Sequence, residues 1–173
     1  MKQLTIIRLF ALTACCPLAL QVQAGQDNIA PLAHATVSNA LSEAYGAENI
    51  NDGRIMYDGS GEWACKGFVP AWGVMYMPWA QLEWDNEVSI DRVVLYDRVS
   101  QAEHTAGGTL HFSDGSTVSV TGIPNDGSAR SVTFAPKTVK WLRFEATDGN
   151  GKNIGLSEIE VFPARGENTE YTE

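Results

Sequence analysis

The sequence has 173 residues, of which 44% are hydrophobic and 19% charged, and its formal net charge at pH 7 is −9. This length and apolar content suit one folded domain with a substantial hydrophobic core. The 21 acidic residues outnumber the 12 basic ones, which argues against nucleic-acid and anionic-membrane partners, since both attract clustered cations. The excess carboxylates favour solubility, and a cation such as calcium would suit some of them.

The first 24 residues have the pattern of a signal peptide. Lys2 and Arg8 accompany an apolar run, and small residues precede Gly25 as a signal peptidase requires. The run is too short to cross a bilayer of about 30 Å as a helix. We therefore expect a secreted protein, extracellular or periplasmic, without a transmembrane segment. Lipid anchoring at Cys15 is the alternative, because the residues before it resemble a bacterial lipobox.

One cysteine, Cys65, follows the expected cleavage site. The mature domain can then have no internal disulfide, so its stability has to come from core packing and from any bound ion. We expect a buried, unreactive Cys65, with a reactive thiol as the alternative.

The segment 25–163 shows short runs of alternating polarity and no convincing amphipathic helix. Strands are predicted, in chain order, within Asn28–Val37 (one edge strand) and at Ile90–Tyr96, Gly108–Phe112, Thr117–Thr121, Ala129–Phe134, Thr138–Ala146 and Leu156–Phe162. Ser113-Asp114-Gly115-Ser116 is the strongest hairpin signal. This spacing favours an all-β sandwich or jelly roll. The polar segment 164–173 is predicted to be a disordered tail.

A long region without clear periodicity, 38–78, separates the first strand from the others. It carries Trp63, Trp72 and Tyr76. Loops of this length are usually functional or held in place by another part of the protein.

The order of several short motifs resembles a known family. They are Asn51-Asp52-Gly53, Trp63, Pro78-Trp79-Ala80-Gln81-Leu82-Glu83-Trp84, Val93 to Arg98 and Gly155 to Phe162. In this order they resemble the coagulation-factor 5/8 type C, or discoidin, family, together with the related family 32 carbohydrate-binding modules and fucose-binding lectins. The resemblance covers residues 28–162. It implies an eight-stranded jelly-roll β-sandwich of the galactose-binding-like type.

Several large side chains are expected to fill the space between the two sheets, because aromatic side chains bury large areas. These are Trp79, Leu82, Trp84, Trp141 and Phe144. Trp63 is expected to plug the core beneath the loops.

The resemblance also implies a structural calcium ion between the long first loop and the last strand. The implied ligands are the carboxylates of Asp52 and Glu158 and the carbonyls of Asn49 and Arg54. Ser60 or Glu62 could supply another of the six to eight oxygens that calcium prefers. The alternatives are an ordinary Asx turn at Asp52 and a solvated Glu158.

In lectin-like relatives an arginine after the central strand contacts sugar, and Arg98 occupies that place. His104 lies near the position of a second polar contact, and Trp72 and Tyr76 could offer a stacking platform. The resemblance thus implies a secreted, non-catalytic module that binds a poly- or oligosaccharide. The alternatives are an Asp97–Arg98 ion pair, a solvated His104, and a hydrophobic lid formed by the two aromatic side chains.

Two other function classes stay open. A small carbohydrate-active lyase or hydrolase could use Glu103-His104 and Asp97-Arg98 as an acid–base pair, although the sequence contains no nucleophile elbow, His-Glu-x-x-His motif or phosphate loop. A protein-interaction or adhesion module with a protein partner is the other class, because one fold supports many functions.

Overall fold

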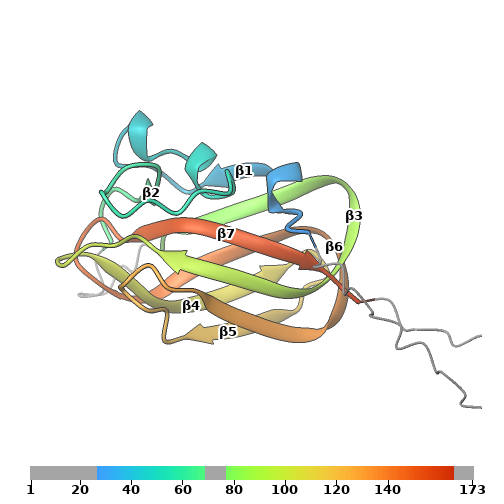
Figure 1. The fold of residues 1–173 in the computed structure, drawn as a ribbon. Coiled ribbons are helices and arrows are strands. Elements are labelled where there is room, and N and C mark those ends of the chain that lie inside the picture. Colours follow the sequence, from blue (N-terminus) through green and yellow to red (C-terminus); the bar gives the residue numbers. More distant parts are fainter. Residues whose placement is uncertain (1–26, 69–76, 166–173) are drawn as a thin grey trace, which may run out of the picture.

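The computed structural model describes residues 27–68 and 77–165 (Figure 1). The elements in chain order are η1 (Ala30–Leu32), β1 (His34–Val37), η2 (Glu43–Tyr45), η3 (Ala47–Asn49), β2 (Trp63–Ala64), β3 (Trp79–Asp97), β4 (His104–Phe112), β5 (Thr117–Thr121), β6 (Arg130–Asn150) and β7 (Gly155–Pro163). The expected signal peptide, Cys15, Trp72, Tyr76 and the tail beyond residue 165 lie outside the described residues. The division into signal peptide, domain and tail stays a prediction.

The strands form two packed layers that share the two long strands β3 and β6. The first layer contains β1, residues 79–84 of β3, residues 141–150 of β6, β4 and β5. The second contains β2, β7, residues 88–97 of β3 and residues 130–139 of β6. The pairing of β3 with β6 is interrupted between Glu83 and Val88, where the chain passes between layers, and such interruptions bend strands. This arrangement confirms the all-β sandwich, with seven continuous strands in the described residues.

The predicted strands agree well with the observed ones. β5 has the predicted bounds, and the two strands predicted between 129 and 146 are parts of the single strand β6. The β4–β5 hairpin turns at Asp114, whose Oδ1 accepts hydrogen bonds from the N–H and Oγ–H of Ser116 at 2.8 and 2.5 Å. Gly115 there has φ +83°, a conformation that glycine adopts without strain.

The core lies between the layers and follows the two-residue period of each strand. In the first layer Leu82, Leu142 and Phe144 are fully buried, and in the second Leu95 and Ile159 are. Trp84 is 4% exposed and donates a hydrogen bond from Nε1 to the Ile29 carbonyl at 3.0 Å. These residues confirm most of the predicted core.

The core prediction is wrong for Trp79 and Trp141. Both are only partly buried, because they alternate with buried neighbours and project to the outer side of the first layer. There the Arg143 guanidinium carbon lies 4.2 Å from the Trp79 ring centroid and 5.8 Å from that of Trp141. Gln81 Oε1 accepts hydrogen bonds from Nε and Nη2 of Arg143, at 3.0 and 2.7 Å. The two indoles therefore stabilise the solvent side of the layer through cation–π contacts.

Residues 38–68, the described part of the long first loop, are packed onto one end of the sandwich. Trp63, in β2, is fully buried as expected, and its Nε1 donates a hydrogen bond to the Asn39 carbonyl at 2.9 Å. β2 pairs with β7, where Trp63 opposes Leu156. Cys65 is completely buried, with 0% exposure, and among the described residues it forms no disulfide. Burial raises the pKa of its thiol to about 11. The predicted burial of Cys65 is confirmed, and its lack of reactivity stays a prediction that the raised pKa supports.

The two sides of β6 give a stability prediction. Phe144→Ala should lower the free energy of unfolding by about 3–5 kcal/mol, because it leaves a cavity between the layers. Trp141→Ala, three residues earlier on the solvent side, should cost less than half as much. Urea denaturation of both variants checks this, and equal losses would contradict the assignment of Trp141 to the outer side.

Candidate functional site

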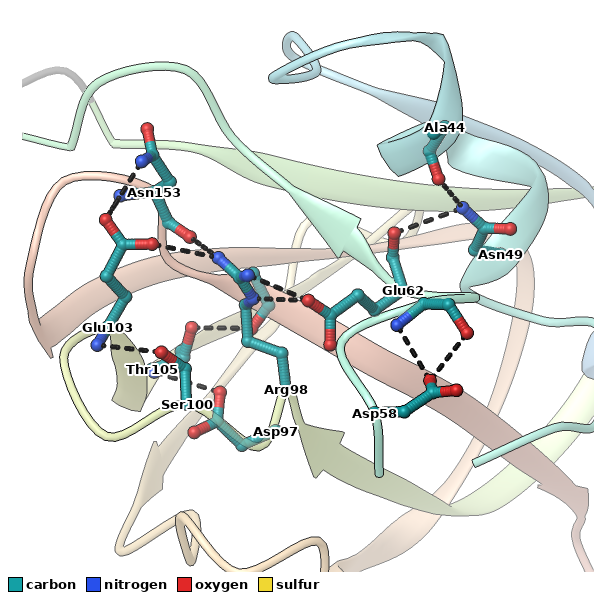
Figure 2. Close-up of polar contacts among 12 residues, drawn as sticks. Ala44, Asn49, Asp58, Glu62, Asp97, Arg98, Ser100, Glu103, Thr105 and Asn153 are labelled. Atoms are coloured by element: carbon teal, nitrogen blue, oxygen red, sulfur yellow. Dashed lines mark hydrogen bonds and ion pairs between the residues drawn. The ribbon is translucent and has the colours of Figure 1, made fainter. Parts of the chain in front are cut away.

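The candidate site is the loop end of the sandwich, where residues 41–62, 98–104, 122–129 and 150–154 meet. Arg98, directly after β3, lies at its centre and is 8% exposed (Figure 2). A cation can be buried to this extent only where opposite charges and hydrogen-bond acceptors surround it.

Three loops supply the acceptors for Arg98. Glu62 Oε1 lies 2.8 Å from both Nε and Nη2, and Glu103 Oε2 lies 3.2 Å from Nη1. Nη1 also donates a hydrogen bond to the Asn153 carbonyl. Figure 2 shows the guanidinium between these groups. Nε donates one hydrogen bond and Nη1 two, and Nη2 lies within ion-pair distance of Glu62. Arg98 thus fastens three loops together.

The two carboxylates around Arg98 differ in their surroundings. Glu62 is 1% exposed, and burial raises its pKa while Arg98 opposes that shift. Its Oε2 has no hydrogen-bond partner in the described residues. Glu103 is more exposed, and its Oε1 accepts hydrogen bonds from the main-chain N–H and Nδ2–H of Asn153, at 3.2 and 2.9 Å. Both oxygens of Glu103 therefore accept hydrogen bonds, and its part in the enzymatic alternative stays a prediction.

Asp97 does not form the expected ion pair with Arg98. Its carboxylate is fully buried, and Oδ1 accepts a hydrogen bond from the Thr105 N–H at 3.0 Å while Oδ2 has no partner in the described residues. Burial raises the pKa of Asp97 to about 8. The ion pairs of Arg98 are formed with Glu62, in the long first loop, and with Glu103, in the same loop as Arg98.

Of the other three predicted ligand contacts, the structure describes only His104. His104 is the first residue of β4, is partly buried, and pairs with Asn150 of β6 through the main chain. It therefore lies at the loop end, as expected. Trp72 and Tyr76 lie outside the described residues. The assignment of these side chains to a ligand stays a prediction.

The sequence interpretation missed one aromatic residue beside Arg98. Tyr45, at the end of η2, has its ring centroid 5.8 Å from the Arg98 guanidinium carbon. Nothing in the local sequence indicates this proximity, because 53 positions separate the two residues in the chain.

The predicted calcium ligands lie around the turn at Asp52. Asp52 Oδ1 accepts a hydrogen bond from the Arg54 N–H at 2.9 Å, which makes an Asx turn. Asn49 uses Nδ2 to donate hydrogen bonds to the carbonyls of Ala44 and Glu62, at 3.0 and 3.1 Å. Asn49 thereby joins the segment that precedes the turn to two other parts of the long loop, at Ala44 and Glu62.

Glu158 of β7 lies close to this turn and is not solvated. It is 1% exposed, and neither carboxylate oxygen has a partner of good hydrogen-bond geometry in the described residues. Burial raises its pKa to about 8; nearby N–H groups of Gly53 and Arg54 oppose the shift, and the charge of Asp52 adds to it. A buried carboxylate without a partner, next to a second carboxylate, has the donor chemistry that calcium prefers.

The side chains alone would not complete a metal site. In residues 27–68 and 77–165 no three His, Cys, Asp or Glu side chains gather in a way that could hold a metal ion. Calcium at Asp52 and Glu158 would therefore need main-chain carbonyls, such as those proposed for Asn49 and Arg54. The residues fit a calcium ion on that condition.

Comparison with protein families identifies the domain. The family model described as "Domain of unknown function (DUF7402)" matches residues 28–162. The chain belongs to the DUF7402 family. No curated protein matches it. Among the described residues, no helix of this DUF7402 domain is long and apolar enough to cross a membrane.

Solved structures of similar fold include carbohydrate-binding modules and lectins. Chitosan-binding module 1 of a chitosanase/glucanase from Paenibacillus sp. IK-5 has 23% identity and a TM-score of 0.60, over 79% of this chain and 98% of that one. The family 32 module of C. perfringens NanJ, in complex with galactose, has 15% identity and a TM-score of 0.61, over 78% and 97%. A striped bass (Morone saxatilis) fucolectin has 18% identity and a TM-score of 0.66, over 81% and 50%. These likenesses confirm the galactose-binding-like fold.

The first prediction for the site concerns Arg98. Arg98→Ala should destabilise the fold by about 3 kcal/mol, because it leaves Glu62 buried without its counter-charge. Adding Glu62→Gln should restore part of this loss. Guanidinium denaturation measures both, with the exposed Lys66→Ala as a control. A loss no larger than that of the control would show that Arg98 does not hold the loops.

The second prediction concerns pH. Because the folded pKa of Asp97 is about 8 and its ordinary value is 3.8, the folded state holds this proton more tightly than the unfolded state. Stability from the protonated group is complete below pH 4 and is lost as the pH rises through 8. Asp97→Asn should remove this part of the loss, which is on the order of a few kcal/mol.

The measurement is urea denaturation of the wild type and Asp97→Asn at pH 5 and pH 8.5. Asp114→Asn serves as a control, because Asp114 is exposed and its pKa is lowered by Ser116. Identical pH dependence in the wild type and Asp97→Asn would contradict the raised pKa.

Proposed function

We propose that this DUF7402 domain is an exported, non-catalytic, discoidin-type module that binds a poly- or oligosaccharide at the loop end of its sandwich. The observation that carries the proposal is the loop end itself, where Arg98 fastens three loops and an aromatic ring lies beside it. Fixed loops that present aromatic and hydrogen-bonding side chains on a rigid scaffold are typical of ligand sites.

The relatives in fold support this function. Beyond the structures described above, a second chitosan-binding module was solved with chitotriose, and the lectin domain of Lectinolysin with Lewis b. Their ligands differ, so they support saccharides as a class and name no particular sugar. Export is supported by the N-terminal residues alone.

Arg98 then has two tasks in the proposed site. Its hydrogen bonds and ion pairs hold the loops in place, and an Nη2 N–H that does not point at Glu62 can contact one sugar oxygen. His104, Trp72 and Tyr76 complete the proposed contacts. Pre-organised loops reduce the entropy lost when a ligand binds, so the main contribution of Arg98 to affinity would be to position the others.

A glycan array followed by calorimetry tests the function. The wild type should bind at least one glycan class with a dissociation constant below about 1 mM, which corresponds to roughly 4 kcal/mol. His104→Ala should weaken that binding without lowering the unfolding temperature. Absence of any binding at millimolar glycan would refute the function, and turnover of the glycan would favour the enzymatic alternative.

We also propose that calcium binds Asp52 and Glu158 and braces the long loop. The bound ion would supply a positive charge between two carboxylates that otherwise repel each other. Calcium should raise the unfolding temperature, because an ion that binds only the folded state stabilises it; at a concentration 100 times the dissociation constant the gain is about 2.7 kcal/mol.

Thermal unfolding with excess calcium and with chelator measures this effect. Glu158→Gln should abolish the response to calcium, and Glu43→Gln, an exposed control, should leave it intact. An identical midpoint with and without calcium in the wild type would rule out the site.

A further inference from the structure

Tyr57 is the most exposed aromatic side chain for which the structure gives a value, at 65%. Its ring nevertheless contacts a neighbouring loop. A Cβ atom on Gly127 would lie 2.3 Å from Cε1 of Tyr57 and 3.1 Å from Cγ2 of Val99, so the ring packs directly on the bare main chain of Gly127. Gly127 also has φ +78°, which other residues rarely adopt. The Tyr57 ring is therefore supported by Gly127, and most of its surface is open to solvent.

The support beneath Tyr57 belongs to the same loop end as Arg98. Asn125 Nδ2 donates a hydrogen bond to the Ser100 carbonyl at 2.7 Å, and its Oδ1 accepts one from the Ser100 N–H at 3.4 Å. The turn that carries Gly127 is thus joined to the loop that begins at Arg98. The ring and the Arg98 contacts therefore belong to loops that are hydrogen-bonded to each other.

Two identical turns meet at this ring. Asp58-Gly59-Ser60 directly follows Tyr57, and Asp126-Gly127-Ser128 lies under it. In each turn the Asp Oδ1 accepts hydrogen bonds from the Ser N–H and Oγ–H, at 3.1 and 2.6 Å in the first and 2.9 and 2.6 Å in the second.

The carboxylates of Asp58 and Asp126 both stay ionised, and each can accept further hydrogen bonds. The serine hydrogen bonds lower the pKa of Asp58 and of Asp126. No described residue donates a hydrogen bond to Oδ2 of either group, and no described cation lies within 4 Å of them. An ionised carboxylate only accepts hydrogen bonds, so a molecule bound here must present donors.

We propose that Tyr57, Asp58 and Asp126 form a saccharide subsite. One sugar ring packs its C–H face on the Tyr57 ring and donates hydrogen bonds from its edge to the two carboxylates. This inference rests on the proposed function and adds to it the residues of one subsite and the chemistry they require. The required donors are hydroxyl groups or a protonated amine, and an amino sugar offers both.

The chain contains a matched control for this arrangement. Asp114-Gly115-Ser116, in the β4–β5 hairpin, is a third copy of the turn, with the same two hydrogen bonds at 2.8 and 2.5 Å. It carries no exposed tyrosine, since Ser113 stands where Tyr57 stands in the first copy. Substitution of Asp114 therefore changes the same turn chemistry away from the subsite.

The experiment titrates the full mature chain with two probes, a glucosamine oligomer and a glucose oligomer of equal length. Tyr57→Ala should weaken binding of the preferred oligomer about tenfold or more, as expected for an aromatic anchor, whereas Tyr57→Phe should bind as the wild type does. Asp58→Asn and Asp126→Asn should each weaken binding several-fold, and Asp114→Asn should not. Thermal unfolding of every variant checks that the fold is intact.

The two probes distinguish the donors. Preference for the glucosamine oligomer that falls with added salt and disappears in the two Asn variants assigns a protonated amine, and equal binding of both oligomers assigns hydroxyl groups. Wild-type binding that Tyr57→Ala leaves unchanged would overturn the subsite while the proposed function stands. No binding of either oligomer, together with a silent glycan array, would overturn both.

Discussion

The buried guanidinium of Arg98 is the group around which the loop end is organised. A cation that is 8% exposed needs its donors satisfied, and the groups that satisfy it come from residues 36, 5 and 55 positions away in the chain. Each of the three loops is long enough to adopt many conformations by itself. Their common attachment to one rigid, planar cation selects the arrangement in which all of its acceptors meet.

This use of charge follows from the absence of covalent restraints. The described residues contain one cysteine, which is buried and free, so no disulfide fixes the region between β1 and β3. Hydrophobic packing fixes part of it, through Trp63 and Ile50. The rest is held by polar contacts. Near them, buried oxygens of Glu62, Asp97 and Glu158 have no hydrogen-bond partner among the residues that the structure describes. Such groups cost stability, and their gathering at the loop end is typical of a place where function competes with stability.

The sandwich could be predicted from the sequence and its loop end could not, for a physical reason. Alternating polarity and turn residues, which are local signals, predict the strands at 104–112, 117–121 and 155–163. Alternation does not say which side of a strand faces the core when both sides carry large residues. Trp79 and Trp141 were therefore placed inside, although Ala80, Leu142 and Phe144 occupy the inner positions.

The loop end depends on contacts between residues far apart in the chain. The pattern at 97–98 suggests a neighbouring ion pair, and the actual partner, Glu62, lies in a loop with no periodicity to place it. The family resemblance located Arg98, Asp52 and Glu158 by position, and the structure brings Asp52 near Glu158 as that resemblance implies. It gave no indication of Tyr45 or Tyr57, because their proximity to other loops is set by tertiary packing.

The three Asp-Gly-Ser turns show how far local sequence reaches. In each turn the serine hydrogen bonds are the largest cause of the lowered aspartate pKa, so the three residues determine the turn and most of its local electrostatics; Asp114 also has Lys137 3.9 Å away. Their surroundings differ because the fold places two of them beside the Tyr57 ring and one at a solvent-exposed hairpin. The proposed function therefore depends on where the fold brings loops together: the same tripeptide is a simple turn in one place and a proposed part of a binding surface in another.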